Sequence, residues 1–135
     1  MLGVGVAETV KLIIAVALGG ALGAVGRYLI SAQVAQWFSS NIPWSTLLVN
    51  VLGSFILGAL YQCGVLFWHP SDAVKAFLVV GILGGFTTFS TFSLDVVLLF
   101  ERGHWGIGAL YAVGSMLVAI LGLVVGLLFI RSIFT

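Results

Sequence analysis

One ten-residue segment combines polar side chains with weak helix formers inside a long apolar stretch: Gly84-Gly85-Phe86-Thr87-Thr88-Phe89-Ser90-Thr91-Phe92-Ser93. Glycine and β-branched threonine disfavour the helix. A helix broken at membrane depth is tolerated only where protein or an aqueous cavity covers the freed backbone. Freed carbonyl oxygens can coordinate a cation, as the unwound segments of transporters do. We therefore expect a broken helix with a capacity for ion binding.

Two phenylalanines of this segment, Phe89 and Phe92, are three residues apart and share a helical face. Phenylalanine is most often a packing residue, and that interpretation stays open. A phenyl edge carries partial positive charge, however. Beside Ser and Thr hydroxyls, such edges would suit a small, hard anion.

A second polar pattern, Thr46, Asn50 and Ser54, recurs every four residues and so lies on one helical face. The Asn50 amide offers two donor hydrogens and an acceptor near membrane depth. It could hold helices together, the common role of such an amide, or it could line a polar pathway. On a later helix, Tyr111 and Ser115 are also four residues apart.

Pairs of glycines four residues apart predict close helix contacts, at Gly19 with Gly23 and at Gly122 with Gly126. Arg27 follows the first pair near the end of the same predicted helix. Its side chain could extend to the lipid headgroups. It could equally raise the potential for an anion entering the protein, and we hold both alternatives.

The composition indicates an all-α integral membrane protein, because 61% of the residues are hydrophobic and 7% are charged. Soluble domains have about 25% charged residues, and about 20 apolar residues cross a bilayer as a helix. The chain therefore forms one domain, residues 1–135, with four spans. These spans are predicted at about residues 9–30, 46–67, 73–100 and 106–130. Ser71 is expected to cap the third.

The distribution of Lys and Arg sets the orientation of membrane helices. Lys11, Lys75 and Arg131 lie on one side of a four-span protein, and Arg27 and Arg102 lie on the other. Three against two is almost no bias, so the chain is expected to insert both ways up. Such a chain can form a dimer of oppositely oriented copies. The net charge of +1 does not suggest nucleic acid as a partner.

The sequence contains no nucleotide-binding loop, metal-ligand cluster or nucleophile–base set, so we predict that it is not an enzyme. One rival is a small drug/proton exporter, which needs a carboxylate within the membrane. The candidates, Glu8 and Asp95, are not centred in a span. Another rival is a structural membrane protein, which would not explain the broken helix.

The motifs resemble the Fluc (also called CrcB) fluoride channel family over nearly the whole chain, most weakly in the fourth span. The matching segments are Gly19-Gly20-Ala21-Leu22-Gly23-Ala24-Val25-Gly26-Arg27-Tyr28, Thr46-Leu47-Leu48-Val49-Asn50-Val51-Leu52-Gly53 and Gly81-Ile82-Leu83-Gly84-Gly85-Phe86-Thr87-Thr88-Phe89-Ser90-Thr91-Phe92-Ser93. The resemblance implies an antiparallel homodimer in the bacterial inner membrane. Two pores at its interface would export fluoride passively and lower the cytoplasmic fluoride concentration.

The same resemblance implies roles for particular residues. A structural sodium ion at the dimer centre would be held by backbone carbonyls of Gly84 and Thr87 from each subunit. Family members often have Glu at the position of Asp95, and Ala119 cannot supply the hydroxyl that would continue the pathway beyond Ser115. The fluoride pathway would comprise Asn50, Phe89, Phe92, Ser90, Thr91, Tyr111 and Ser115.

The physical chemistry of fluoride agrees with this set of residues. Fluoride holds its water tightly, so a pore must replace that water with other donors. Amide, hydroxyl and phenyl-edge groups are donors without formal charge. A full cation in the pore could hold the ion too long, since conduction requires binding that is weak enough to release.

Overall fold

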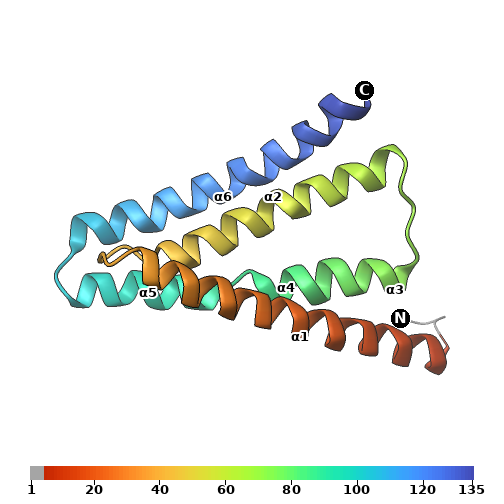
Figure 1. Cartoon of the computed structure of the whole chain (residues 1–135), viewed down its shortest axis with the longest axis horizontal. Helices are drawn as coiled ribbons and strands as arrows, with labels where there is room; N and C mark the ends of the chain where they lie inside the picture. Colours follow the sequence, from red (N-terminus) through yellow and green to blue (C-terminus); the bar gives the residue numbers. More distant parts are fainter. Residues whose placement is uncertain (1–4) are drawn as a thin grey trace.

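Four long apolar helices, each able to cross a membrane, make up the computed structural model, which describes residues 5–135 (Figure 1). The predicted number of spans is therefore confirmed. The third span is built from four consecutive elements. In chain order the elements are α1 Val6–Trp37, α2 Trp44–Leu66, α3 Asp72–Lys75, the π-helix η1 Ala76–Leu83, α4 Gly84–Phe86, α5 Phe89–Glu101 and α6 Trp105–Phe134.

The first helix is longer than the sequence predicted. We expected it to end near Ile30, yet α1 continues to Trp37. The added turns contain no glycine or proline to stop a helix, and Val34 within them is buried. At about 1.5 Å per residue, its 32 residues extend beyond a hydrocarbon core of about 30 Å. Arg27 thus lies further from the helix end than we expected.

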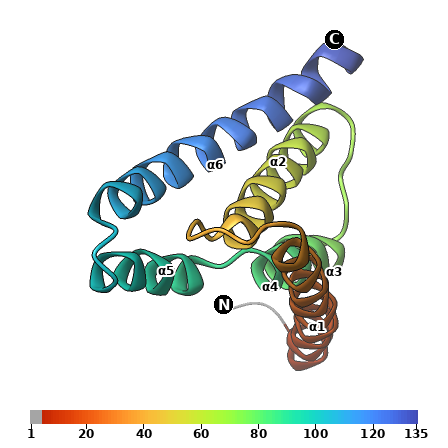
Figure 2. The ribbon, with the colours of Figure 1, turned by 60° about the vertical axis from the view of Figure 1, so that its left-hand side comes forward.

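Glycines join the helices into two pairs, one of α1 with η1 and α4, and one of α2 with α6 (Figure 2). A Cβ atom added at Gly19 or Gly23 would collide with the carbonyl oxygens of Phe77 and Ile82. A Cβ added at Gly126 would likewise collide with Phe55 O. Both predicted glycine pairs therefore lie in helix contacts, although a Cβ added at Gly122 would be less crowded, at 3.2 Å from Val51 O.

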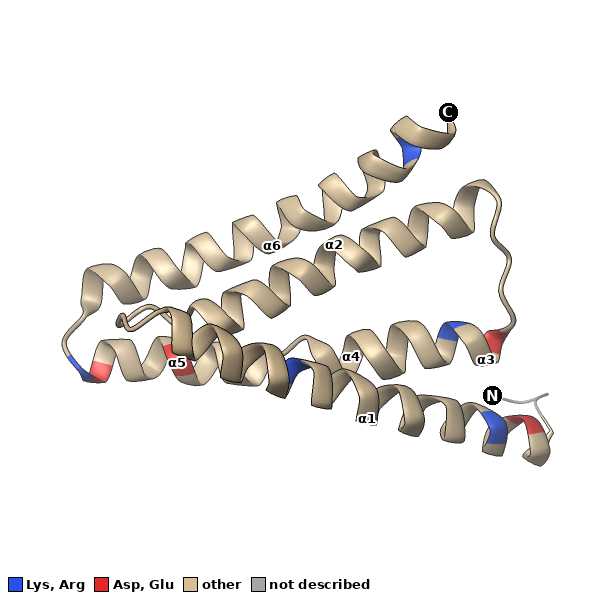
Figure 3. Cartoon of the chain, viewed as in Figure 1, with Lys and Arg blue, Asp and Glu red and all other residues tan. Residues whose placement is uncertain are grey.

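The outer surfaces of the spans are apolar. Between 11% and 28% of the most apolar window of each span is buried within the chain, so most of these side chains face outward. The charged residues gather near the helix ends (Figure 3). Two charged residues lie within helices instead: Arg27 in α1 and Asp95 in α5. This distribution suits a protein surrounded by lipid.

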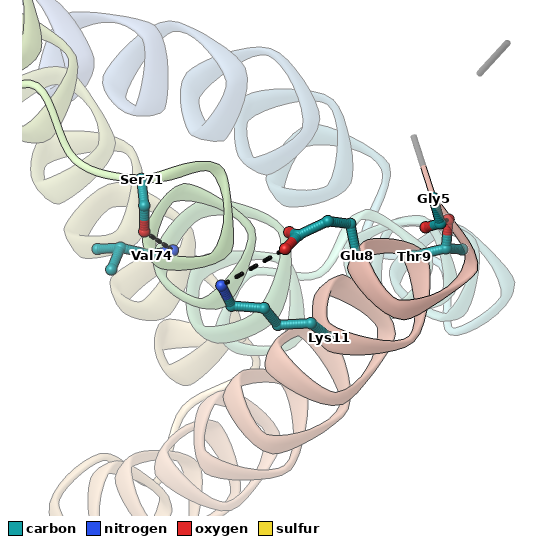
Figure 4. Close-up of polar contacts among 6 residues, drawn as sticks. All are labelled: Gly5, Glu8, Thr9, Lys11, Ser71 and Val74. Carbon is teal, nitrogen blue, oxygen red and sulfur yellow. Dashed lines mark hydrogen bonds and ion pairs between the residues drawn. The ribbon is translucent and has the colours of Figure 1, made fainter. Parts of the chain in front are cut away.

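Polar contacts mark the end of the molecule where α1 and α3 begin (Figure 4). Glu8 and Lys11 form an exposed ion pair of 4.0 Å on α1. The Ser71 hydroxyl accepts a hydrogen bond of 3.4 Å from the Val74 amide, which confirms Ser71 as the predicted cap.

Candidate functional site

The break in the third span consists of Thr87 and Thr88, whose backbones are extended between α4 and α5. We expected the glycines to take part in the break, but Gly84 has helical dihedral angles, φ −64° and ψ −37°. Gly85 is needed for helix packing instead, because a Cβ there would lie 2.6 Å from Gly20 O. The Thr88 hydroxyl caps α5 by accepting a hydrogen bond of 3.2 Å from the Thr91 amide.

Asn50 of α2 holds this break in place. Its Nδ2 donates to the Thr88 carbonyl at 3.0 Å, and its Oδ1 accepts from the Thr88 amide at 2.7 Å. The side chain thus satisfies both backbone groups of one extended residue. A primary amide carries two N–H hydrogens, so one donor hydrogen of Asn50 remains for another acceptor.

These bonds deprive two carbonyl groups of their helical donors. In a continuous helix, the Gly84 carbonyl would accept from the Thr88 amide four residues on. That amide instead donates to Asn50 Oδ1. The Thr87 carbonyl would accept from the Thr91 amide, which instead donates to the Thr88 hydroxyl. Gly84 and Thr87 therefore each present a backbone oxygen without its helical partner.

A pocket of about 370 Å³, here named the central pocket, lies beside the break, and none of the residues within 5–135 that line it is charged. Ser115 Oγ is buried there and has no hydrogen-bond partner among the described residues. Phe92 is buried, whereas Phe89 is 73% exposed. The lining residues are Asn50, Gly53, Ser54, Leu57, Val79, Leu83, Gly84, Thr87, Thr88, Phe89, Phe92, Ser115, Met116 and Ala119.

Three aromatic rings form a short series that begins at this pocket and leads away from it. The ring centroids of Phe89 and Phe92 are 5.5 Å apart with their planes at 45°. Those of Phe92 and Tyr111 are also 5.5 Å apart, at 40°. Such tilted pairs turn a ring edge toward the neighbouring face. Tyr111 does not line the pocket, and its hydroxyl donates to Asp95 Oδ2 at 3.2 Å.

A second pocket, of about 260 Å³ and here named the Arg27 pocket, lies between α1, α2 and α5. Thr88 lines both pockets, so the break separates them. No ion pair to Arg27 occurs among residues 5–135. The lining residues are Ala24, Arg27, Tyr28, Ser31, Thr46, Val49, Thr88 and Thr91. A cation surrounded by hydroxyl groups can attract an anion.

The structure brings most, but not all, of the predicted site residues together. Thr91 lines the Arg27 pocket, and Ser90 Oγ lies 3.4 Å from the Thr88 hydroxyl. The sequence interpretation gave no role to Thr88, which contacts Asn50, caps α5 and separates the pockets. Its position before an apolar helical stretch is a recognisable N-cap signal. The central pocket gathers Asn50, Gly84, Thr87, Phe89, Phe92 and Ser115.

Comparison with known proteins gives consistent matches over most of the chain. Residues 14–127 match the family model described as "CrcB-like protein, Camphor Resistance (CrcB)". The "Fluoride-specific ion channel FluC" of Rhodospirillum centenum is 52% identical over 122 residues, covering 90% of this chain and 97% of that protein. The FluC proteins of Nitrobacter winogradskyi and Agrobacterium fabrum are 45% and 46% identical, over 121 and 119 residues. These alignments cover 90% and 88% of this chain, and 96% and 95% of the two relatives.

Proposed function

This chain belongs to the CrcB family of membrane channels, and from that premise we propose that it conducts fluoride selectively across the bacterial inner membrane. It is not an enzyme. A channel transports passively, so fluoride leaves the cell whenever its electrochemical gradient points outward. The protein thereby lowers the cytoplasmic fluoride concentration.

The observation that carries this proposal is the composition of the central pocket. Its donors are an amide and several hydroxyl groups, and two phenyl rings lie beside them. Fluoride is a small, strong acceptor and can exchange its water for such donors. None of the described residues that line the pocket carries a charge that would hold the ion, which favours release as well as entry.

The proposed assembly is an antiparallel homodimer with two pores. The exposure of two residues that flank the break, Gly84 and Phe89, supports it. Gly84 is exposed, and a Cβ there would meet only Val79 O, at 3.8 Å. Phe89, also at the break, leaves most of its ring outside the subunit. Lipid cannot satisfy the polar groups of the central pocket, so a second copy is the more suitable cover for this side.

Orientation can be tested directly with a reporter at the C-terminus. We expect both orientations in one cell population, because the Lys and Arg residues are nearly balanced between the two sides. Three lysines added to the connection between α2 and α3 should enforce one orientation and abolish fluoride transport when that variant is expressed alone. A wild-type reporter found on one side only would contradict the antiparallel dimer.

We also propose a structural sodium ion at the dimer centre. The Gly84 and Thr87 carbonyls have lost their helical donors, and neutral oxygen ligands suit a hard monovalent cation. Two carbonyls from each of two subunits would surround the ion. It would offset the carbonyl dipoles and fix the subunits in register.

The deciding experiment for the function is reconstitution into liposomes with fluoride and chloride efflux measured in parallel. We expect rapid fluoride efflux and negligible chloride efflux, because chloride is larger and a weaker acceptor. Protein-free liposomes provide the baseline. Equal rates for both anions, or no efflux above that baseline, would refute the proposal.

A further inference from the structure

The hydroxyl group of Ser54 differs from several other hydroxyls in the spans. Serine and threonine within a helix commonly donate to a carbonyl of the preceding turn. Thr87 does so to Leu83 O at 2.9 Å, and Ser132 does so to Phe129 O at 2.8 Å. Ser54 makes no such bond, nor does any other hydrogen bond to it occur among residues 5–135. Its donor is therefore available.

Ser54 also lines the central pocket, together with Ser115. The two serines come from different helices, α2 and α6, which pack closely against each other. Ser115 Oγ is buried without a hydrogen-bond partner in the described part of the chain. Two hydroxyl groups without a hydrogen-bond partner among residues 5–135 thus border one pocket within the spans, where an unmet polar group is costly.

The α6 side of the pocket lacks hydroxyl groups beyond Ser115. Ala119 lies one turn further along α6 and lines the pocket with a methyl group, and Met116 contributes a thioether. On the α2 side, Ser54 lies one turn beyond Asn50 and supplies a hydroxyl there. The donors of the pocket therefore continue along α2 after they stop on α6.

We infer that Ser54 is a further ligand of the permeating anion and supplies the donor that Ala119 cannot. This inference rests on the proposed fluoride channel and identifies one more residue of its pathway. Apart from Ser54, no residue that α2 or α6 adds to the pocket lining after Asn50 and Ser115 has a side-chain donor. The Ser54 hydroxyl replaces one water molecule at that step.

The test compares fluoride efflux from liposomes for three variants and the wild type. Ser54→Ala removes the donor, and Ser54→Cys retains the volume but offers only a weak donor. Both should conduct fluoride roughly tenfold more slowly, the factor that corresponds to about 1.4 kcal/mol. Ser54→Ala/Ala119→Ser returns a hydroxyl to the pocket from the other helix and should recover most of the lost rate.

Ser132→Ala is the matched control, because its hydroxyl is already bonded within its own helix, and its efflux rate should equal that of the wild type. Wild-type efflux rates from both Ser54 variants would overturn the inference while leaving the channel proposal intact. A slow Ser54→Ala variant that Ala119→Ser does not rescue would overturn it too, because the loss would not come from a missing hydroxyl. Absence of fluoride efflux from the wild type would instead refute the channel itself.

Discussion

Replacing Asn50 with leucine tests the connection between the broken helix and ion conduction. The change removes both hydrogen bonds to Thr88, of 3.0 and 2.7 Å, at a partly buried position. A buried polar group without a partner costs about 1–3 kcal/mol. Two such groups would therefore cost roughly 2–6 kcal/mol, which is a large part of a typical folding free energy of about 5–15 kcal/mol.

The freed Thr88 amide has one obvious new acceptor, the Gly84 carbonyl four residues earlier. If it forms that bond, the break becomes helical and Gly84 no longer presents a free oxygen. We therefore expect Asn50→Leu to lose fluoride efflux and also the stabilisation of the dimer by sodium. A variant that only lacked an anion ligand would lose efflux and keep the sodium effect.

Three measurements separate these outcomes: fluoride efflux, thermal stability in sodium against a large organic cation, and hydrogen exchange at the Thr88 amide. Asn41→Leu is the control, because it removes an exposed amide from a connection and should change stability by less than about 0.5 kcal/mol. If Asn50→Leu keeps normal efflux and normal Thr88 exchange, Asn50 does not hold the break and the reasoning is wrong.

Three further predictions concern the pocket and the proposed dimer centre. Phe92→Ile retains an apolar side chain but removes the ring edge, so fluoride efflux should fall at least tenfold, by about 1.4 kcal/mol; unchanged efflux would make Phe92 a packing residue. Gly84→Leu should prevent dimer formation, as measured by gel filtration. Gly114→Leu, where an added side chain also has space within the subunit, should leave the dimer intact. Equal dimer fractions for the two variants would contradict this prediction. Removal of sodium should lower dimer stability by about 2.7 kcal/mol when the initial concentration is 100 times Kd, and unchanged stability and fluoride efflux would exclude the structural ion.

The four spans and their glycine contacts could be predicted because they depend on local composition. An apolar stretch must be long enough to cross the membrane, and each of the four is. Close contact between helices requires small residues at matching intervals. Gly23 and Gly126 show this requirement, since neither position has room for a Cβ atom.

The details of the break could not be predicted because they depend on contacts between distant residues. Asn50 and Thr88 are 38 positions apart, and no local pattern shows that one amide pairs with both backbone groups of the other residue. The sequence correctly indicated weak helical propensity from Gly84 onward. It did not indicate that Gly84 and Gly85 stay helical, with Gly85 packed against α1, while Thr87 and Thr88 become extended.

The Asn50–Thr88 pair also determines how the two pockets relate to each other. Thr88 lines both of them, and Asn50 fixes its backbone, so this pair forms part of the wall between a pocket with an arginine and a pocket without charge. Under the proposed function, Arg27 would concentrate the anion on one side of that wall. The neutral donors on the other side would then bind it more weakly. A route that places the charge outside the neutral central pocket attracts fluoride without retaining it, which is the balance that conduction requires.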